Sequence, residues 1–113
     1  MPSRLTVARE PSDIFKVIGH PDRVRLIEEL RVADKDVNTL AVHTHLPPTR
    51  VSQHLALLRS HRLVDEKREG RHHVYRLTQP EIAQWIVEAI RFIEQRGPAS
   101  LSAEAEEARM LWS

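Results

Sequence analysis

The stretch LPPTRVSQHLALLRSHRLV, residues 46–64, constrains the fold of this chain most strongly. Two prolines precede a run that favours a helix, and proline is tolerated at the first helical position because its missing N–H has no partner there. On a wheel of 3.6 residues per turn, one face carries Val51, Leu55 and Leu58, with Arg62 at its end. The opposite face carries short polar side chains and one methyl group: Thr49, Ser52, Gln53, Ala56 and Ser60. This polar face suits close approach to base edges and phosphates, although an ordinary solvent-exposed helix face accounts for the same residues.

Three further helices are predicted before this stretch. The first covers residues 13–18 and ends at Gly19. The second starts with Pro21 as its first residue and continues to about residue 32. The third follows Asp36, whose side chain can cap its first turn. With the helix of residues 46–64, they give the succession of short helices that a helix-turn-helix requires.

Two extended segments and a long helix are predicted after it. Residues 64–68 and 72–77 flank Glu69 and Gly70, a turn pair that favours a β-hairpin. A helix follows from residue 80 to about residue 96, with apolar residues at spacings of three and four. We therefore expect a mostly α-helical fold with a small β-hairpin, in the order of a winged helix-turn-helix: four helices, two strands and a fifth helix.

Positive charge gathers in the middle of the chain. The formal net charge of the 113 residues is only +1, yet between Arg50 and Arg76 the basic residues outnumber the acidic residues by four. Lys67, Arg68 and Arg71 flank the predicted turn, where a phosphate backbone could meet them. A charged hairpin that contacts only solvent is the alternative interpretation.

The length and the last predicted helix favour self-association. A chain of 113 residues is expected to form one domain with a small core, to which a shared interface would add buried surface. Residues 1–11 are expected to form an N-terminal arm, residues 12–96 a DNA-binding and dimerisation domain, and residues 97–113 a linker with a C-terminal helix or tail. The apolar stripe of the helix predicted from residue 80 to about residue 96 can form a dimer interface or, as the alternative, pack within its own domain. The residues expected at a homodimer interface are Ile14, Phe15, Ile82, Trp85, Ile86, Ala89, Ile90 and Ile93.

Composition excludes several classes of protein. No apolar run is long enough to cross a bilayer and no signal-peptide pattern opens the chain, so we expect a cytoplasmic protein that has no membrane partner. The absence of cysteine excludes disulfides and thiolate metal sites. Three glycines and scattered acidic residues form no catalytic set or phosphate-binding loop, so we do not expect an enzyme.

The segments VIGHPDRVRLIEEL, VNTLAVHTHLPPTRVSQHLALLRSHRLV and EKREGRHHVYRL resemble the ArsR/SmtB family of bacterial winged-helix transcription regulators, over about residues 14–96. The resemblance implies a homodimer that binds a double-stranded DNA operator of two half-sites, usually as a repressor released by an inducer, whose identity the sequence does not give. His54 lies at the border of the apolar face, where a partly buried structural histidine is the alternative. The family often has a capping serine where this chain has Pro47, so the backbone N–H groups of the first helical turn need other hydrogen-bond acceptors. The DNA contacts that the resemblance implies are Thr49, Arg50, Ser52, Gln53 and His54 in the major groove, and Lys67, Arg68, Arg71 and His72 on the wing.

The family's metal sites do not carry over to this chain. At the positions that match its last-helix zinc site the chain has Gln79, Glu81, Phe92 and Gln95, of which only Glu81 can bind a metal. We therefore expect no metal and no cofactor. A regulator or activator that responds to nickel, cobalt or zinc through a histidine site remains an alternative, because the chain has seven histidines. A winged-helix module that docks protein is the other alternative, and DNA binding would then not depend on Gln53 or Arg71.

Overall fold

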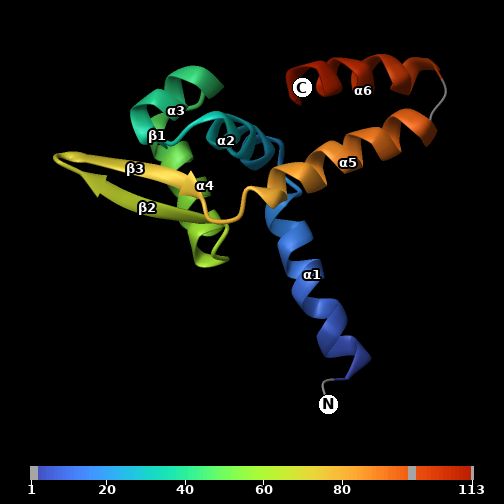
Figure 1. Ribbon diagram of the computed structural model, residues 1–113, viewed down its shortest axis with the longest axis horizontal. Helices are drawn as coiled ribbons and strands as arrows, with labels where there is room; N and C mark the ends of the chain where they lie inside the picture. Colours follow the sequence, from blue (N-terminus) through green and yellow to red (C-terminus); the bar gives the residue numbers. More distant parts are fainter. Residues whose placement is uncertain (1–2, 97–98, 113) are drawn as a thin grey trace. The chain divides into compact units, whose positions relative to one another are not determined.

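The computed structural model describes residues 3–96 and 99–112 (Figure 1). The chain divides into two compact units, Met1–Gln79 and Pro80–Ser113, which are described separately below. None of the described helices combines the length and the apolar character that a bilayer crossing requires.

Four helices form most of the first unit: α1 (Arg4–Ile18), α2 (Pro21–Val32), α3 (Val37–Thr44) and α4 (Pro48–Ser60). Helix α1 starts well before the predicted residue 13, so most of the expected N-terminal arm is helical. Proline inside a helix costs about 3 kcal/mol, yet α1 continues through Pro11. Gly19 ends α1 as predicted, at a place where a Cβ atom would lie 2.9 Å from the carbonyl oxygen of Phe15.

The starts of α2 and α3 follow the predicted capping. Pro21 opens α2, and the amide of Asp22 donates to Nδ1 of His20 at 3.1 Å. The amide of Thr39 donates to Oδ1 of Asp36 at 2.7 Å, and this hydrogen bond lowers the pKa of the Asp36 carboxyl. After α3, His45 adopts a left-handed conformation (φ 58°) that turns the chain toward α4.

The core of this unit is formed mainly by apolar side chains from α2, α3 and α4, together with Val64 from the segment after α4. The predicted apolar face of α4 is confirmed, since Val51, Leu55 and Leu58 are fully buried. Arg62 does not belong to that face, because it follows the end of α4 in a left-handed conformation (φ 59°) and is exposed. The largest fully buried side chains are Leu26, Ile27, Leu40, Val51, Leu55, Leu58 and Val64.

The predicted hairpin is present as β2 (Val64–Glu69) and β3 (His72–Leu77), paired antiparallel. Glu69 pairs with His72, so the turn has two residues and Gly70 occupies its first position with φ 62°. Glycine is favoured there because the left-handed region strains other side chains. A third strand, β1 (Lys35–Asp36), pairs with β3 and gives the order β1-β3-β2. It was not predicted, because two residues carry no periodic signal.

The second unit contains α5 (Glu81–Arg96) and α6 (Ala99–Trp112), and α6 folds back along α5 (Figure 1). Helix α6 begins inside the segment that was expected to be a linker, of which residues 97 and 98 lie outside the described part. Nε of Arg109 in α6 lies 3.1 Å from a carboxylate oxygen of Glu94 in α5, and the side chain of Trp112 is buried. The observed order of helices and strands confirms the expected fold class, with one added strand, while α6 lies in the segment where a linker with a C-terminal helix or tail was expected.

Candidate nucleic-acid interface

The polar face of α4 is exposed, and at its end the Ser60 hydroxyl donates to the carbonyl oxygen of Leu57 at 2.7 Å. Thr49, Ser52 and Gln53 are exposed, and within the described residues their side chains form no hydrogen bond. Pro47 provides no side-chain cap, and the amide of Arg50 instead donates to the Pro47 carbonyl oxygen at 3.0 Å. The helix therefore presents short donors and acceptors that remain available to an external partner.

The basic residues of α4 and the hairpin divide into paired and unpaired groups. In the described part of the chain, no ion pair involves Arg50, Arg68 or Arg71, and all three are exposed. The excess positive charge of this segment is therefore carried largely by these side chains. Three ion pairs neutralise others: Arg59–Glu66 at 2.7 Å, Lys67–Glu69 at 3.5 Å and Arg76–Asp65 at 3.5 Å.

The two histidines of the hairpin have acidic neighbours. His73 contacts the carboxylate of Glu66, and Nδ1 of His72 lies 4.0 Å from a carboxylate oxygen of Asp36. The side chain of His72 nevertheless remains 74% exposed. Of the predicted wing contacts, Arg68 and Arg71 are thus unpaired, whereas Lys67 and His72 each have a carboxylate nearby.

His54 differs from the other residues predicted to contact DNA. Its side chain is only 13% exposed and lies against the start of α2, where its ring centroid is 4.7 Å from that of His20. Burial lowers the pKa of His54, with smaller contributions of both signs from Asp22, His20 and Arg23. These contacts favour the structural alternative for His54, and a DNA contact at this residue stays a prediction.

One group of potential metal ligands was not found from the sequence. His20, Asp22 and His54 bring ligand atoms within 4.8 Å of one another, in the part of the chain that was searched. His20 caps the start of α2 and His54 lies in the middle of α4, so the two are far apart in the sequence and no local spacing indicates that they meet. In the structure His43 lies 3.1 Å from a carboxylate oxygen of Glu29.

The apolar stripe of α5 divides into a buried and an exposed part. Ile82, Ile86 and Ile90 are at least 91% buried within the single chain, so they have little surface to offer a second copy. The exposed apolar residues of α5 are Trp85, Ala89, Phe92 and Ile93, and Met110 and Leu111 of α6 are exposed as well. The predicted interface does not include Phe92, whose exposed ring was considered only as a match to a position of the family's zinc site. In the first unit, Phe15 of α1 is 60% exposed, whereas Ile14 is half-buried.

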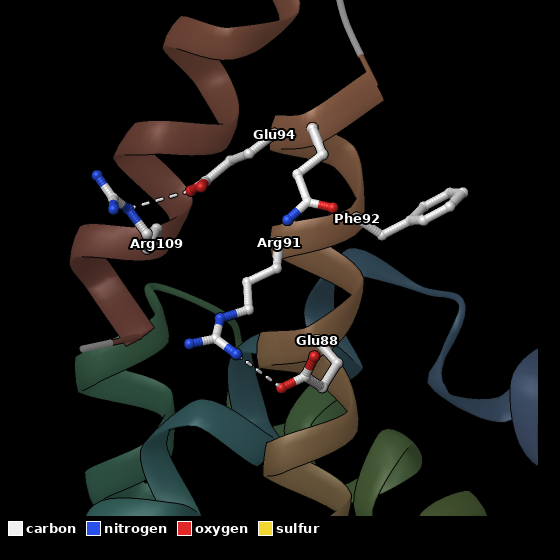
Figure 2. Close-up of a pocket in the computed structure, with 6 residues that line it drawn as sticks. Glu88, Arg91, Phe92, Glu94 and Arg109 are labelled. Carbon is white, nitrogen blue, oxygen red and sulfur yellow. Dashed lines mark hydrogen bonds and ion pairs between the residues drawn. The ribbon is translucent and has the colours of Figure 1, made fainter.

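Helices α5 and α6 line an open pocket of about 630 Å³ (Figure 2). Figure 2 shows Arg91 directed toward Glu88 and Arg109 toward Glu94, with nitrogen–oxygen distances of 3.2 Å and 3.1 Å. Each arginine is therefore compensated by a glutamate, and the lining presents no unpaired charge for an ionic ligand.

A buried three-helix core, an exposed polar helix and a hairpin with unpaired arginines define a winged helix-turn-helix protein. The family model described as bacterial regulatory protein, arsR family, matches residues 20–66. The regulator KmtR of Mycobacterium tuberculosis is 35% identical over 86 residues, which is 76% of this chain and 66% of KmtR, just under two thirds of its length. The uncharacterized regulator Rv0081 of the same organism is 32% identical over 79 residues, 69% of each chain. The chain belongs to the ArsR family, which confirms the resemblance seen in the sequence. The members of this family are transcription regulators and not enzymes.

Solved structures confirm the fold. The crystal structure of Rv0081 has a TM-score of 0.71 and 27% identity, and the match covers 83% of this chain and 93% of that one. The solution structure of Mb0332 from Mycobacterium bovis is described as a homodimeric winged helix-turn-helix DNA-binding domain. It matches with a TM-score of 0.73 and 22% identity over 87% of this chain and 95% of its own.

Proposed function

We propose that this chain is a sequence-specific transcription regulator that binds a double-stranded DNA operator as a homodimer and represses transcription in the cytoplasm. The observation that carries the proposal is the combination of three unengaged polar side chains on α4, Thr49, Ser52 and Gln53, with the unpaired Arg68 and Arg71 of the hairpin. Solvent exposure accounts for either feature alone, whereas their combination on a winged helix-turn-helix favours DNA binding. Repression is the direction that the resemblance to the ArsR/SmtB family implies.

The two parts of this surface have different physical roles. Thr49, Ser52 and Gln53 have short side chains on a rigid helix, and such side chains discriminate bases through directional hydrogen bonds in the major groove. Arg68 and Arg71 carry long, charged side chains on the hairpin. Their charges attract the phosphate backbone of DNA of any sequence. We therefore assign sequence preference to α4 and most of the general affinity to the wing.

The proposed dimer rests on the exposed apolar residues of α5 and α1. Trp85 is 52% exposed and Phe92 is 59% exposed, and large apolar side chains on a surface often mark a contact with another protein. The Mb0332 domain is described as homodimeric, which supports self-association of this chain without identifying the interface. A two-fold dimer would place two copies of α4 against two half-sites.

Selection of bound sequences from a random duplex pool tests the proposal. The selected operator and a shuffled duplex of equal composition are then titrated with the wild type, with Gln53→Ala and with Gln84→Ala as a matched control on α5. We expect Gln53→Ala to cost on the order of 1–3 kcal/mol on the operator and little on the shuffled duplex, while Gln84→Ala changes neither. No enrichment from the pool, or equal affinities for both duplexes, would instead favour the protein-docking module.

A further inference from the structure

A single side chain connects α1, α2 and α4. Arg23 lies in the first turn of α2, and its Nε donates to the carbonyl oxygen of Val17 while its Nη2 lies 3.5 Å from that of Lys16. Its Nη1 lies 3.3 Å from Nδ1 of His54. One guanidinium group therefore joins the last turn of α1 to the helix that we propose reads DNA.

His54 is held from its other side by Asp22. Nε2 of the ring lies 3.3 Å from Oδ2 of Asp22. A guanidinium group can only donate, so Nδ1 must accept from Arg23, and the neutral ring then carries its proton on Nε2 and donates it to the carboxylate. Burial favours this uncharged form by lowering the pKa of His54. Both ring nitrogens are thus satisfied, and the side-chain direction is fixed by two bonds.

The same assignment argues against a metal ion between His20, Asp22 and His54. A histidine that binds a metal offers a lone pair to the ion and donates its other N–H to an acceptor. Here Nδ1 of His54 faces the Arg23 guanidinium and Nδ1 of His20 accepts from the Asp22 amide, so both neutral rings keep their proton on Nε2. Neither ring has an uncommitted lone pair, and the positive charge of Arg23 lies beside the cluster.

We propose that Arg23, His54 and Asp22 form a clamp that positions α4 against α2 and the end of α1, and that this clamp sets how sharply the protein distinguishes its operator from other DNA. The inference rests on the proposed function. Ser52 and Gln53, the two residues before His54, lie on the exposed face of α4. By holding His54, the clamp fixes the positions of these two side chains. Hydrogen bonds to base edges are lost when a side chain is displaced by a fraction of an ångström, whereas long wing side chains can follow the phosphates. None of the three clamp residues needs to touch DNA.

A pair of substitutions separates the clamp from simple packing. His54→Leu fills a similar space without hydrogen bonds, while His54→Gln keeps one acceptor for Arg23 and one donor for Asp22. We expect His54→Leu to weaken operator binding about tenfold and random-duplex binding less than about twofold, as the loss of directional bonds predicts. We expect His54→Gln to remain within about threefold of the wild type on both. His61→Leu is the matched control, because His61 follows the end of α4 and its ring hydrogen-bonds Leu57 and Ser60, which belong to α4 itself.

Arg23→Gln breaks the clamp by removing the guanidinium group that contacts His54 and the end of α1. Circular dichroism shows whether each variant is folded, and Arg23→Gln provides the test if His54→Leu is not. Since both substitutions break one unit, the double variant should lose no more selectivity than either single variant.

The ratio of operator to random affinity should also fall in the wild type as the pH drops below the ordinary histidine range, because a protonated Nδ1 would face the Arg23 guanidinium. The charged and titratable groups around His54 are Asp22, His20 and Arg23. His54→Gln should abolish the pH dependence of selectivity that comes from protonation of His54. If His54 only filled space in the fold, this substitution would leave the pH dependence unchanged.

Three results would overturn the clamp: an equal loss by His54→Leu on both duplexes, full selectivity in that variant, or an unchanged pH profile in His54→Gln. Submicromolar zinc or nickel binding that His54→Leu abolishes would refute the proton assignment and with it the clamp. If the wild type itself shows no sequence preference, the proposed function fails before the clamp is tested.

Discussion

Replacing Arg71 by alanine should weaken binding to every DNA sequence and make that binding less sensitive to salt. Arg71 follows Gly70 in the hairpin turn, is exposed and has no ion-pair partner among the described residues, so its removal leaves no internal group uncompensated. Each phosphate contact contributes about 0.9 to the slope of log affinity against log salt concentration. A dimer would lose two contacts, so the slope should become shallower by about 1.8.

The consequence is large enough to measure by fluorescence anisotropy. Between 50 and 200 mM salt, a slope change of about 1.8 alters the ratio of wild-type to variant affinity by roughly tenfold. The penalty of Arg71→Ala should therefore be about ten times greater at the lower salt concentration, on operator and random duplexes alike. Arg71→Lys keeps the charge and serves as the control, with a slope close to that of the wild type. An unchanged slope in Arg71→Ala, or a loss confined to the operator, would refute the phosphate assignment.

Three further predictions concern assembly, metals and pH. Trp85→Glu should give monomers in sedimentation at micromolar concentration, whereas Val32→Glu, an equivalent change at an exposed apolar residue of α2, should leave the dimer intact; a dimeric Trp85→Glu variant contradicts the interface. Zinc should bind the protein only weakly in calorimetry, because Glu81 is the one potential ligand at the family's last-helix site; tight binding that Glu81→Ala abolishes would show that a site survives there. The folded state holds a proton on His54 less tightly than the unfolded chain does, so stability should fall as the pH drops through the ordinary histidine range. His54→Gln should reduce this acid-induced fall in the thermal midpoint, and an identical fall in both proteins would show that His54 is not its source.

The features predicted correctly from the sequence are those with a local physical cause. The two faces of α4 follow from helical periodicity, the start of α3 follows from the capping side chain of Asp36, and the hairpin turn follows from Gly70. Each of these signals lies within a few residues of the structure that it determines, so one sequence is enough to recognise it.

The features that were missed depend on contacts between distant parts of the chain. Strand β1 exists because Lys35 and Asp36 pair with β3, and nothing within two residues announces that pairing. The apolar residues of α5 share one helical pattern, and the pattern cannot tell which of them the chain itself buries. His54 illustrates the same limit at the candidate site, because its partners Asp22 and Arg23 come from the start of another helix.

The central claim is that the chain recognises a particular DNA sequence, and one competition titration tests it most directly. The selected operator is bound at about 150 mM salt and displaced with random duplex, while the number of chains per operator is measured in the same samples. We expect the operator to be preferred by at least about 10³-fold, as specific regulators typically show, with two chains bound per operator. Equal displacement by operator and random duplex would contradict sequence recognition, whatever the affinity of the protein for DNA.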